Sequence, residues 1–371
     1  MTRKKALIFY ISRYSGHFHA ANAIEKGLLE FSKDIEIKKI NALGYTNPIL
    51  EKVLNRAYME VIKNKPEIWE RIYDNHEVMQ KAEKIREALH KFNMPKMKKL
   101  IEAYSPDAIF CTQAFPCGMA ADYKKKFKKN ILLVGILTDY APHSYWIFDE
   151  VDFYITPSDD ITEELAKKGV PSHKIKAYGI PVDPKFQNEK DPQSIRKGLA
   201  LEEKNETILI MGGTQGLGAI EDVVESLLSD REHNYQLLVV AGANKKLYKR
   251  MSKIKLKSNN NLRVFSYVDN IDELMQISAV IISKAGGMTI AETITKRLPM
   301  VIVDPLPGHE RRNTDYLVKK GAAVEIKEHS QIHKSVNELF DSEGALNKMR
   351  ENIEKLSTKD SALNIAKLAF N

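Results

Sequence analysis

The sequence predicts an α/β protein of two domains, each a parallel sheet covered by helices on both faces. Short apolar and β-branched runs alternate with stretches of helical period along the whole chain, which is the pattern of such sheets. The segment AYGIPVDPKFQNEKDPQ (177–193) interrupts the alternation with three prolines and no apolar period. The alternation restarts at ETILIMGGTQGLGAIEDVVESLL, so the interruption is expected to be the linker between the domains.

The individual elements follow from the same alternation. Strands are predicted at 6–12, 107–111, 131–137, 152–156, 207–211, 236–241, 262–265, 279–283 and 300–304. Helices are predicted at 17–32, 78–103, 118–127, 159–169, 217–229, 244–257, 270–277, 288–297 and 310–319. We expect domains at 1–183 and 184–345, with the last helices, 346–371, crossing back to the first domain. Because ligands of parallel sheets bind beyond the C-terminal ends of the strands, the facing strand ends should form a cleft.

Composition excludes several classes of protein. No apolar run approaches the roughly 18 residues that span a bilayer. The start MTRKKALIFYIS imitates a signal peptide but lacks a small-residue cleavage site, so a first strand is expected there. The two cysteines, Cys111 and Cys117, fit no common metal or redox spacing, and reduced thiols in a cytoplasmic protein are expected.

Positive charge is concentrated in residues 38–99, which hold 14 Lys and Arg against eight Asp and Glu, in a chain of net charge +8. Apolar and aromatic residues, Tyr58 and Trp69 among them, recur there at helical spacing. Such a segment either lies on an anionic membrane with its aromatic groups in the interface, or is an ordinary helix pair with a solvated basic face. Nucleic acid is not expected as a partner, because no RNA- or DNA-binding motif accompanies the charge.

Two glycine-rich loops in the second half each follow a predicted strand and precede a helix. The loop in IMGGTQGLGAIED, with Gly213, either brings backbone amides to a phosphate or makes a tight turn, and the sequence leaves both readings open. A P-loop is excluded because no Lys-Ser/Thr follows. In ISKAGGMTIAET, Gly286, Gly287 and Thr289 open a helix whose positive end suits a diphosphate. Glu292, one turn further on, either accepts hydrogen bonds from a ribose or is a solvated helix carboxylate.

These motifs resemble one family of glycosyltransferases. In the second half the similar stretches are GGTQGLG, VFSYVDNIDELM, SKAGGMTIAET, LPMVIVDPLPGHE and KKGAAVEI, and in the first half SGHFHAANAI, LTDYAPHSYWIFDEVDFYITPSD and YGIPVDPKF. The family is that of the monogalactosyldiacylglycerol synthases and processive diacylglycerol glucosyltransferases. The peptidoglycan lipid-intermediate GlcNAc transferase is a more distant likeness. The resemblance implies the GT-B fold, in which two Rossmann-like domains face each other across a cleft.

The resemblance also implies which residues bind a UDP-sugar donor. The residues at the family's donor positions are Gly16, Gly213, Thr214, Tyr267, Val268, Lys284, Gly286, Gly287, Met288, Thr289, Glu292, His309, Glu310 and Asn313. Among them the two glycines of the second loop would hold the diphosphate, and the backbone near Tyr267 would meet uracil. The chain departs from the family at two motifs, with RYSGH where G-G-G-H is usual and PGHE where P-G-Q-E is usual.

Acid–base chemistry is assigned to the strand ends of the first domain. Transfer to a hydroxyl needs a base for the acceptor proton, and histidine titrates near neutral pH. His17 follows the first strand and matches the family's histidine, so it is the predicted base or acceptor-positioning group, while His19 is expected to point elsewhere. In TDYAPHSYW, Asp139 and His143 are further catalytic candidates, Asp139 as orienter of His17 or of the acceptor. Trp146 is expected to cover lipid or stack on sugar, unless this stretch is simply a packed loop with a capping aspartate.

The predicted function combines these assignments. No D-x-D triplet occurs, so metal-independent transfer without a cofactor is expected, by a single displacement that inverts the anomeric carbon. We predict transfer of a hexose from a UDP-sugar to a lipid hydroxyl, preferably diacylglycerol, by an enzyme held peripherally at the cytoplasmic face of an anionic membrane. The alternatives are a UDP-GlcNAc-type transferase to a polyprenyl-linked or lipopolysaccharide-type acceptor, a UDP-sugar 2-epimerase, and a non-catalytic UDP-sugar-binding protein.

Overall fold

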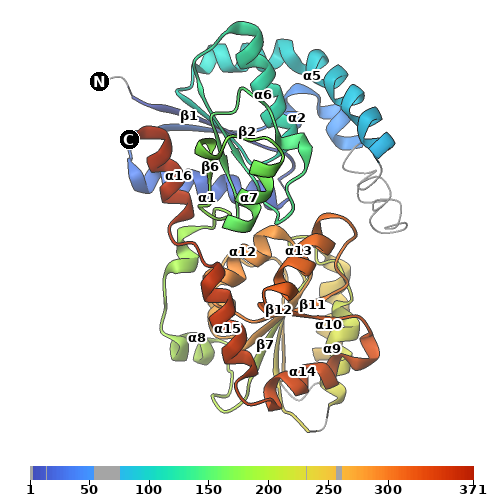
Figure 1. Cartoon of the computed structure of the whole chain (residues 1–371). Helices are drawn as coiled ribbons and strands as arrows, with labels where there is room; N and C mark the ends of the chain where they lie inside the picture. The colour runs from blue at the N-terminus through green and yellow to red at the C-terminus, as the bar shows by residue number, and fades with distance from the viewer. Residues whose placement is uncertain (1–2, 14, 54–75, 231, 256–260) are drawn as a thin grey trace. The chain divides into compact units, whose positions relative to one another are not determined.

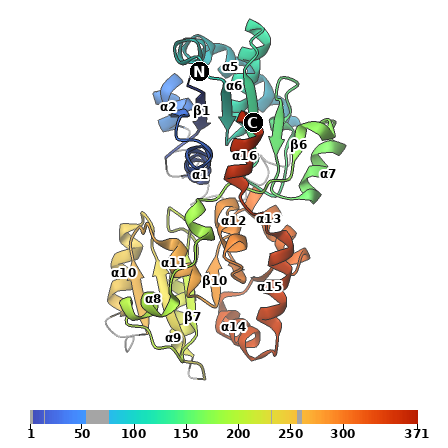
Figure 2. The same cartoon turned by 90° about the vertical axis from the view of Figure 1, so that its left-hand side faces the viewer.

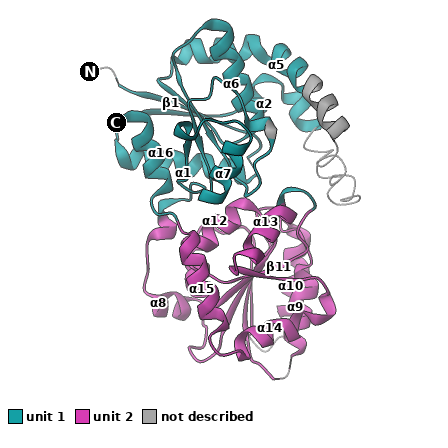
Figure 3. Ribbon diagram, in the orientation of Figure 1, with its two compact units in different colours: residues 1–184, 307–309, 358–371 teal, residues 185–306, 310–357 magenta. Residues whose placement is uncertain are grey.

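The computed structural model describes residues 3–13, 15–53, 76–230, 232–255 and 261–371 (Figure 1). The chain divides into two compact units, which are coloured separately in Figure 3. Unit 1 comprises Met1–Pro184, Pro307–His309 and Thr358–Asn371, and unit 2 comprises Lys185–Leu306 and Glu310–Ser357.

The described residues of unit 1 form a six-stranded parallel sheet in the order β2-β1-β3-β4-β5-β6. Its strands are β1 (Lys5–Tyr10), β2 (Glu36–Asn41), β3 (Ala108–Cys111), β4 (Leu132–Ile136), β5 (Phe153–Ile155) and β6 (Ile175–Lys176). The helices of this unit are α1 (Gly16–Phe31), α2 (Ala42–Thr46), α5 (His76–Tyr104), α6 (Ala114–Phe127), α7 (Asp159–Lys167) and α16 (Ser361–Phe370). β1 is buried on both faces, which is why it reads as a continuous apolar run, ALIFY. The strand order reverses between β1 and β3, and this reversal is the sheet's switch point.

The described residues of unit 2 form a second six-stranded parallel sheet, in the order β12-β11-β10-β7-β8-β9. Its strands are β7 (Thr207–Met211), β8 (Gln236–Val240), β9 (Leu262–Phe265), β10 (Val280–Ser283), β11 (Met300–Val303) and β12 (Ala323–Ile326). Its helices are α8 (Pro192–Gly198), α9 (Ile220–Ser229), α10 (Lys245–Lys255), α11 (Ile271–Gln276), α12 (Gly287–Thr295), α13 (His309–Lys319), α14 (Ile332–Asp341) and α15 (Ala345–Leu356). Counted from β7, the strands lie in the 3-2-1-4-5-6 order of Rossmann sheets, with the switch point between β7 and β10. The predicted α/β fold class is confirmed.

Three strands were missed by the sequence pattern, and all three lie at sheet edges. β2 and β6 end the first sheet, and β12 ends the second. An edge strand is partly solvated and short or charged, as in EIKKIN of β2, so its apolar signal is weak. Three helices of the described residues were also missed: the short α2, α14, and α8, which begins at Pro192 inside the predicted linker.

The C-terminal helix α16 packs against α1 in unit 1 (Figures 1 and 2). Its Ile365 and Ala366 join the core cluster that contains Ile24 of α1. The approach is so close that a Cβ built on Gly27 would lie 2.5 Å from the carbonyl carbon of Ala362, so only glycine fits there.

The preceding helix, α15, lies in unit 2. Arg350 donates to the carbonyl of Ala279 at 3.4 Å, and Glu354 pairs with Arg297 at 2.8 Å. Our prediction assigned all of 346–371 to the first domain's side. The structure differs because α15 is held by contacts of unit 2, and only the following helix packs on α1.

Candidate active site

In unit 1 the candidate catalytic histidine lies at the switch point of the sheet. β1 ends at Tyr10 and α1 begins at Gly16, so His17 is the second residue of the helix. Thr112, which follows β3, donates its hydroxyl to the carbonyl of His17 at 2.9 Å. The hydroxyl of Thr138, which follows β4, lies 3.1 Å from Nδ1 of the imidazole. Both threonines are buried, so residues after two neighbouring strands hold His17 in place.

The protonation of His17 follows from this environment. Burial lowers the pKa of His17, and the charge of Asp139 partly opposes that lowering. The ring is therefore neutral at neutral pH, which is the form that accepts a proton. We expected Asp139 to orient the ring. Nδ1 shares a hydrogen bond with the hydroxyl of the adjacent Thr138, and Asp139 acts on the ring through its charge.

Ser15 shapes the loop in front of His17. Its hydroxyl donates to the carbonyl of Ile11 at 2.6 Å and to that of Ser12 at 2.8 Å. Ser12 has a φ of 59°, in the left-handed region. Although Ser15 stands at the N-cap of α1, its side chain makes no cap hydrogen bond and closes the turn instead. A serine at a position where the related motif has glycine thus has a structural use within the loop.

The stretch TDYAPHSYW forms a packed turn. The imidazole of His143 lies edge-on to Tyr145, with ring centroids 5.3 Å apart, and its carbonyl accepts from the amide of Trp146 at 3.2 Å. The 3-10 turn η1 (Ser144–Trp146) packs against α6, and the side chain of Trp146 is 5% exposed. The lipid-covering role that we expected for Trp146 does not fit this burial, and the alternative of a packed loop describes the residue better.

In unit 2 two loops begin side by side at the switch point. Met211 and Ser283, the last residues of β7 and β10, are paired in register. The glycine-rich loop 212–219 after β7 turns tightly, with Leu217 donating to the carbonyl of Gly212 at 3.0 Å. The loop after β10 carries Lys284 and leads into α12. Both predicted glycine loops are thus brought to one place in the sheet.

The glycines of these loops serve different purposes. A Cβ built on Gly216 would lie 2.1 Å from the carbonyl oxygen of Ala241, so packing requires this glycine. Around Gly213, no atom of the described chain other than those of the glycine and its two neighbours in sequence lies within 4 Å of the corresponding position. At Gly286 the nearest atoms are Thr289 Oγ1 at 3.9 Å and Glu310 Oε1 at 4.0 Å. The tight-turn reading therefore holds for Gly216, whereas Gly213 and Gly286 leave backbone open to a ligand.

A buried ion pair joins the second loop to α13. Nζ of Lys284 lies 3.4 Å from Oε1 of Glu310, and the two side chains are 10% and 8% exposed. The other carboxylate oxygen of Glu310 accepts from the amide of Leu306 at 2.8 Å. Asn313, also on α13, donates its side-chain amide to the carbonyl of Ala285 at 3.0 Å. The structure thus gathers the predicted donor residues of both motifs around the start of α12.

This start of α12 suits an anion. Gly286 is the N-cap residue, so the free amides and positive end of the helix are at the open backbone just described. Lys284 adds a fixed positive charge two residues away. Gly287 and Thr289 are buried in the first turn, and Met288 and Glu292 are half-buried. A diphosphate has the charge and the size for such a site.

The remaining predicted donor residues lie on other loops of unit 2 or at its boundary. Tyr267, 51% exposed, and the half-buried Val268 follow β9. Burial, then the charges of Asp269 and Glu292, raise the pKa of Tyr267, so Glu292 of α12 faces the same region. Thr214 accepts from the amide of Ala243 at 2.9 Å. The half-buried His309 is the first residue of α13. Of the predicted membrane residues, Tyr58 and Trp69 lie outside the described residues.

The described part of segment 38–99 exposes large apolar side chains. Ile49 is 77% exposed, Phe92 71% and Val53 57%. Exposed lysines at 52, 91, 96 and 99 stand beside them in the chain. Lys96 of α5 donates to the carbonyl of Thr46 at 2.7 Å, which brings α5 next to the short helix that precedes Ile49. No helix among the described residues has both the length and the apolar character needed to cross a membrane.

Comparisons with known proteins agree with the two-unit architecture. Residues 17–182 match the family model of monogalactosyldiacylglycerol (MGDG) synthase, and residues 207–367 match that of the glycosyltransferase family 28 C-terminal domain. A processive diacylglycerol beta-glucosyltransferase of Bacillus pumilus is 28% identical over 368 residues, which cover 98% of this chain and 94% of the relative. The Bacillus subtilis protein of the same name is 27% identical over 362 residues, covering 97% and 93%.

Solved structures show the same fold at low identity. MurG of Acinetobacter baumannii superposes with a TM-score of 0.65 at 14% identity, covering 98% of each chain. Staphylococcus aureus MnaA, solved with UDP, gives a TM-score of 0.62 at 15% identity, covering 98% of this chain and 94% of that one. The fold and the two matched halves define the class: this chain is a glycosyltransferase of the GT-B fold. Its first domain matches the MGDG synthase model and its second the family 28 C-terminal model, which confirms the resemblance of the motifs.

Proposed function

We propose that this protein is an inverting glycosyltransferase that moves a hexose from a UDP-sugar to the hydroxyl of a membrane lipid, with diacylglycerol as the acceptor. The observation that carries the proposal is the kind of group that each of the two sheets presents at its switch point. One holds a neutral histidine, and the other offers an open helix N-terminus beside a buried lysine. The names of the relatives, which match over nearly the whole chain, support diacylglycerol as acceptor and a β-linked product.

The donor is assigned to unit 2. Its diphosphate lies at the backbone of Gly286 and Gly213, where amides and the start of α12 meet negative charge. Lys284 supplies a positive charge to the same place, and Glu310 holds that lysine. These dipoles and charges are fixed before the reaction, so they stabilise the leaving UDP without reorganising.

The acid–base step is assigned to unit 1. Nε2 of His17 accepts the proton of the acceptor hydroxyl while the hydroxyl oxygen attacks the anomeric carbon. The bond from that carbon to the diphosphate oxygen breaks, and its electron pair leaves with UDP. Thr138 keeps Nδ1 engaged, so the ring presents the other nitrogen to the acceptor. One displacement inverts the anomeric carbon, and an α-linked UDP-sugar gives a β-linked glycolipid.

We further propose that this transfer needs no bound metal. Enzymes that bridge the diphosphate with a metal need carboxylates for the ion, and the sequence holds no D-x-D triplet. The positive end of α12 and Lys284 take over the neutralisation of the leaving charge. Added EDTA should therefore leave the rate unchanged.

Access to the acceptor is assigned to the exposed apolar side chains of segment 38–99. Ile49, Val53 and Phe92 are exposed beside lysines, which is the composition of a surface that binds anionic lipid headgroups and dips apolar groups into the interface. We therefore propose that the protein is held peripherally on a membrane, at its cytoplasmic face.

The test is UDP release from a panel of UDP-sugars, with liposomes that contain diacylglycerol and either an anionic or a neutral carrier lipid. We expect release with one UDP-sugar only, dependent on diacylglycerol, faster on anionic liposomes, and accompanied by a glycolipid. Ile49→Ser with Phe92→Ser should lose most of the liposome stimulation. Val318→Ser, which changes an exposed apolar residue of unit 2, is the matched control.

Other products would replace the proposal. Turnover of UDP-GlcNAc onto a polyprenyl-linked acceptor or a lipopolysaccharide-type acceptor would assign a different lipid. Conversion of a UDP-sugar to its 2-epimer without acceptor would make the protein an epimerase. UDP binding without turnover of any donor would leave a binding protein.

A further inference from the structure

One histidine outside the assigned site joins two segments that carry the donor loops. His329, in the 3-10 turn η4 (His329–Gln331), has Nδ1 3.0 Å from Oδ2 of Asp222 and Nε2 2.9 Å from Oδ1 of Asp304. Both ring nitrogens therefore face a carboxylate oxygen. Only the doubly protonated ring donates at both positions, so the bridge is complete when His329 is charged.

Each carboxylate belongs to an element that continues one of the donor loops. Asp222 is in the first turn of α9, directly after the glycine loop 212–219. Asp304 follows β11 and opens the segment that leads through Leu306 to Glu310, the partner of Lys284. Asp304 has a φ of 49°, in the left-handed region, which is unfavourable for a residue other than glycine and must be held by its surroundings.

We propose that His329 is a positioning residue of the donor site, which clamps the loop after β11 to the first turn of α9. The proposal rests on the proposed function, because the donor is assigned there to these loops. The clamp fixes the start of the segment 304–309, while the hydrogen bond from Leu306 to Glu310 fixes its other end. With both ends held, the loops are set for the donor before it binds, which lowers the ordering cost of binding.

The clamp depends on pH because its bridge needs the protonated form of His329. The hydrogen bond to Asp304, and then that to Asp222, raise the pKa of His329. Two other charged groups of the neighbouring elements are engaged elsewhere: Glu221 of α9 pairs with Arg250 at 2.8 Å, and Glu325 of β12 pairs with Arg311. Lys327 and Glu328 adjoin His329 in the chain, Glu225 lies on α9 and Lys334 on α14. His333 of α14 lies 3.2 Å from the hydroxyl of Ser226. The bridge is therefore intact below the pKa of folded His329 and is lost as pH rises through it.

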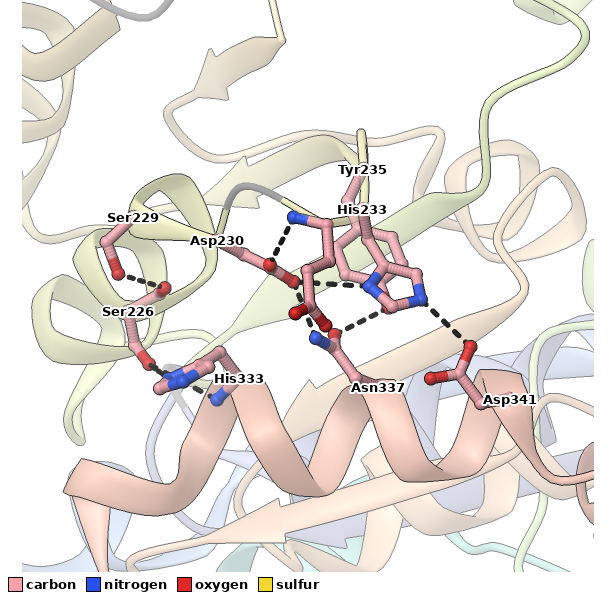
Figure 4. Close-up of polar contacts among 9 residues, drawn as sticks. Ser226, Ser229, Asp230, His233, Tyr235, His333, Asn337 and Asp341 are labelled. Carbon is pink, nitrogen blue, oxygen red and sulfur yellow. Dashed lines mark hydrogen bonds and ion pairs between the residues drawn. The ribbon is translucent and has the colours of Figure 1, made fainter.

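Unit 2 supplies a matched control, drawn in Figure 4. His233 also lies between two carboxylates, with Nε2 2.9 Å from Asp341 and Nδ1 3.5 Å from Asp230. Asp230 is the C-cap residue of α9, whereas Asp222 is in the first turn, so the two bridges contact opposite ends of one helix. His233→Gln removes a hydrogen bond to Asp341 and an ion-pair contact with Asp230, and neither of these touches a donor loop.

The experiment compares His329→Gln with His233→Gln in the full chain. UDP affinity is measured by calorimetry at pH 6 and pH 8.5, and hydrogen exchange is followed in residues 212–222 and 304–309. At pH 6 we expect His329→Gln to weaken UDP binding about 3–10-fold, the factor that one partly exposed charged bridge supplies. The KM for the donor should rise by a similar factor with kcat little changed. Exchange should rise in both segments, and His233→Gln should change none of these quantities.

The pH dependence of UDP affinity and the hydrogen exchange of the two segments test the clamp further. The ratio of affinities between the wild type and His329→Gln should shrink at pH 8.5, because the wild type loses the bridge there. Unchanged exchange in both segments of His329→Gln would overturn the clamp, whatever the affinity. A wild-type protein that binds no UDP would end the donor assignment, and the exchange data would still decide whether His329 holds the two loops.

Discussion

The two switch points differ in the kind of group that they present. At the switch point of unit 1 these groups are side chains, namely the imidazole of His17 and the hydroxyls of Thr112 and Thr138. At the switch point of unit 2 these groups are the open backbone of glycines and the N-terminus of α12, next to the buried ion pair of Lys284 and Glu310. A titratable ring suits proton transfer, whereas fixed dipoles suit the binding of a charged group. Variants of the two places should therefore separate turnover from donor affinity.

The largest effect is expected from His17→Ala. Without the base, kcat should fall about 10²–10⁴-fold, the usual contribution of a general base. UDP affinity should stay at the wild-type value, since the donor contacts are assigned to unit 2. Stopped-flow or product assays for kcat, with calorimetry for UDP, measure both. His19→Ala, two residues along the same helix, is the control and should keep its kcat.

The pH profile sharpens the same prediction. Because burial lowers the pKa of His17, its ring stays neutral somewhat below pH 6.5, the ordinary value. The kcat/KM of the wild type should therefore remain level on acidification to about that pH and fall only through the lowered pKa.

Thr138→Val, which removes the partner of Nδ1, should reduce kcat by about 10-fold, the size of one hydrogen bond. A drop in UDP affinity with unchanged kcat in either variant would contradict the division of labour.

A smaller effect is expected from Gly286→Ala, and this effect is on UDP affinity and not on kcat. The backbone of Gly286 has φ −70°, which alanine adopts freely, and its Cβ would meet nothing nearer than 3.9 Å. The variant should fold with the stability of the wild type. Its methyl group would occupy the space over the helix end, so UDP affinity should fall about 10–100-fold, as for the loss of one charge-assisted hydrogen bond or two.

Gly216→Ala is the matched contrast for this variant. Its φ of 58° and the 2.1 Å approach to the carbonyl of Ala241 leave no room for a Cβ. Gly216→Ala should lower the stability of the protein, measured by thermal unfolding. A loss of UDP affinity in this variant would therefore not be evidence for a role in the donor site. If Gly286→Ala destabilised the chain as much as Gly216→Ala, the glycine would serve packing and not the donor.

The sequence allowed the strand ends to be predicted but not the pairs that meet there. His17, Gly213 and Gly286 each follow an apolar run, so their place at the edge of a parallel sheet follows from local pattern. His17 pairs with Thr138, which lies 121 residues further along the chain, and Lys284 pairs with Glu310, which is separated from it by α12 and β11. These pairs form only in the folded domain, so no local sequence pattern predicts them.

Burial was the other property that the pattern did not reveal. Trp146 follows a strand like the catalytic candidates, and its residue type is common at ligand and membrane surfaces. Its 3-10 turn folds back on α6, which only the packing of the whole domain determines. The His329 bridge was missed for a related reason, because its three residues come from three separate elements and no motif places them together.

The smallest effect concerns stability and distinguishes structural histidines from His17. The hydrogen bond to Asp341 raises the pKa of His233, whereas burial lowers that of His17. Folded His233 binds its proton more tightly than the unfolded chain, so its stabilising contribution is full below pH 6.5 and is lost as pH rises through the folded pKa. His233→Gln should lower the free energy of unfolding by about 0.5 kcal/mol at pH 6, since Asp341 is largely exposed. In urea unfolding of wild type and variant from pH 6 to pH 9, this difference should shrink steadily. A difference that grew with pH would mean that the neutral ring, and not its ion pairs, stabilises this end of α14.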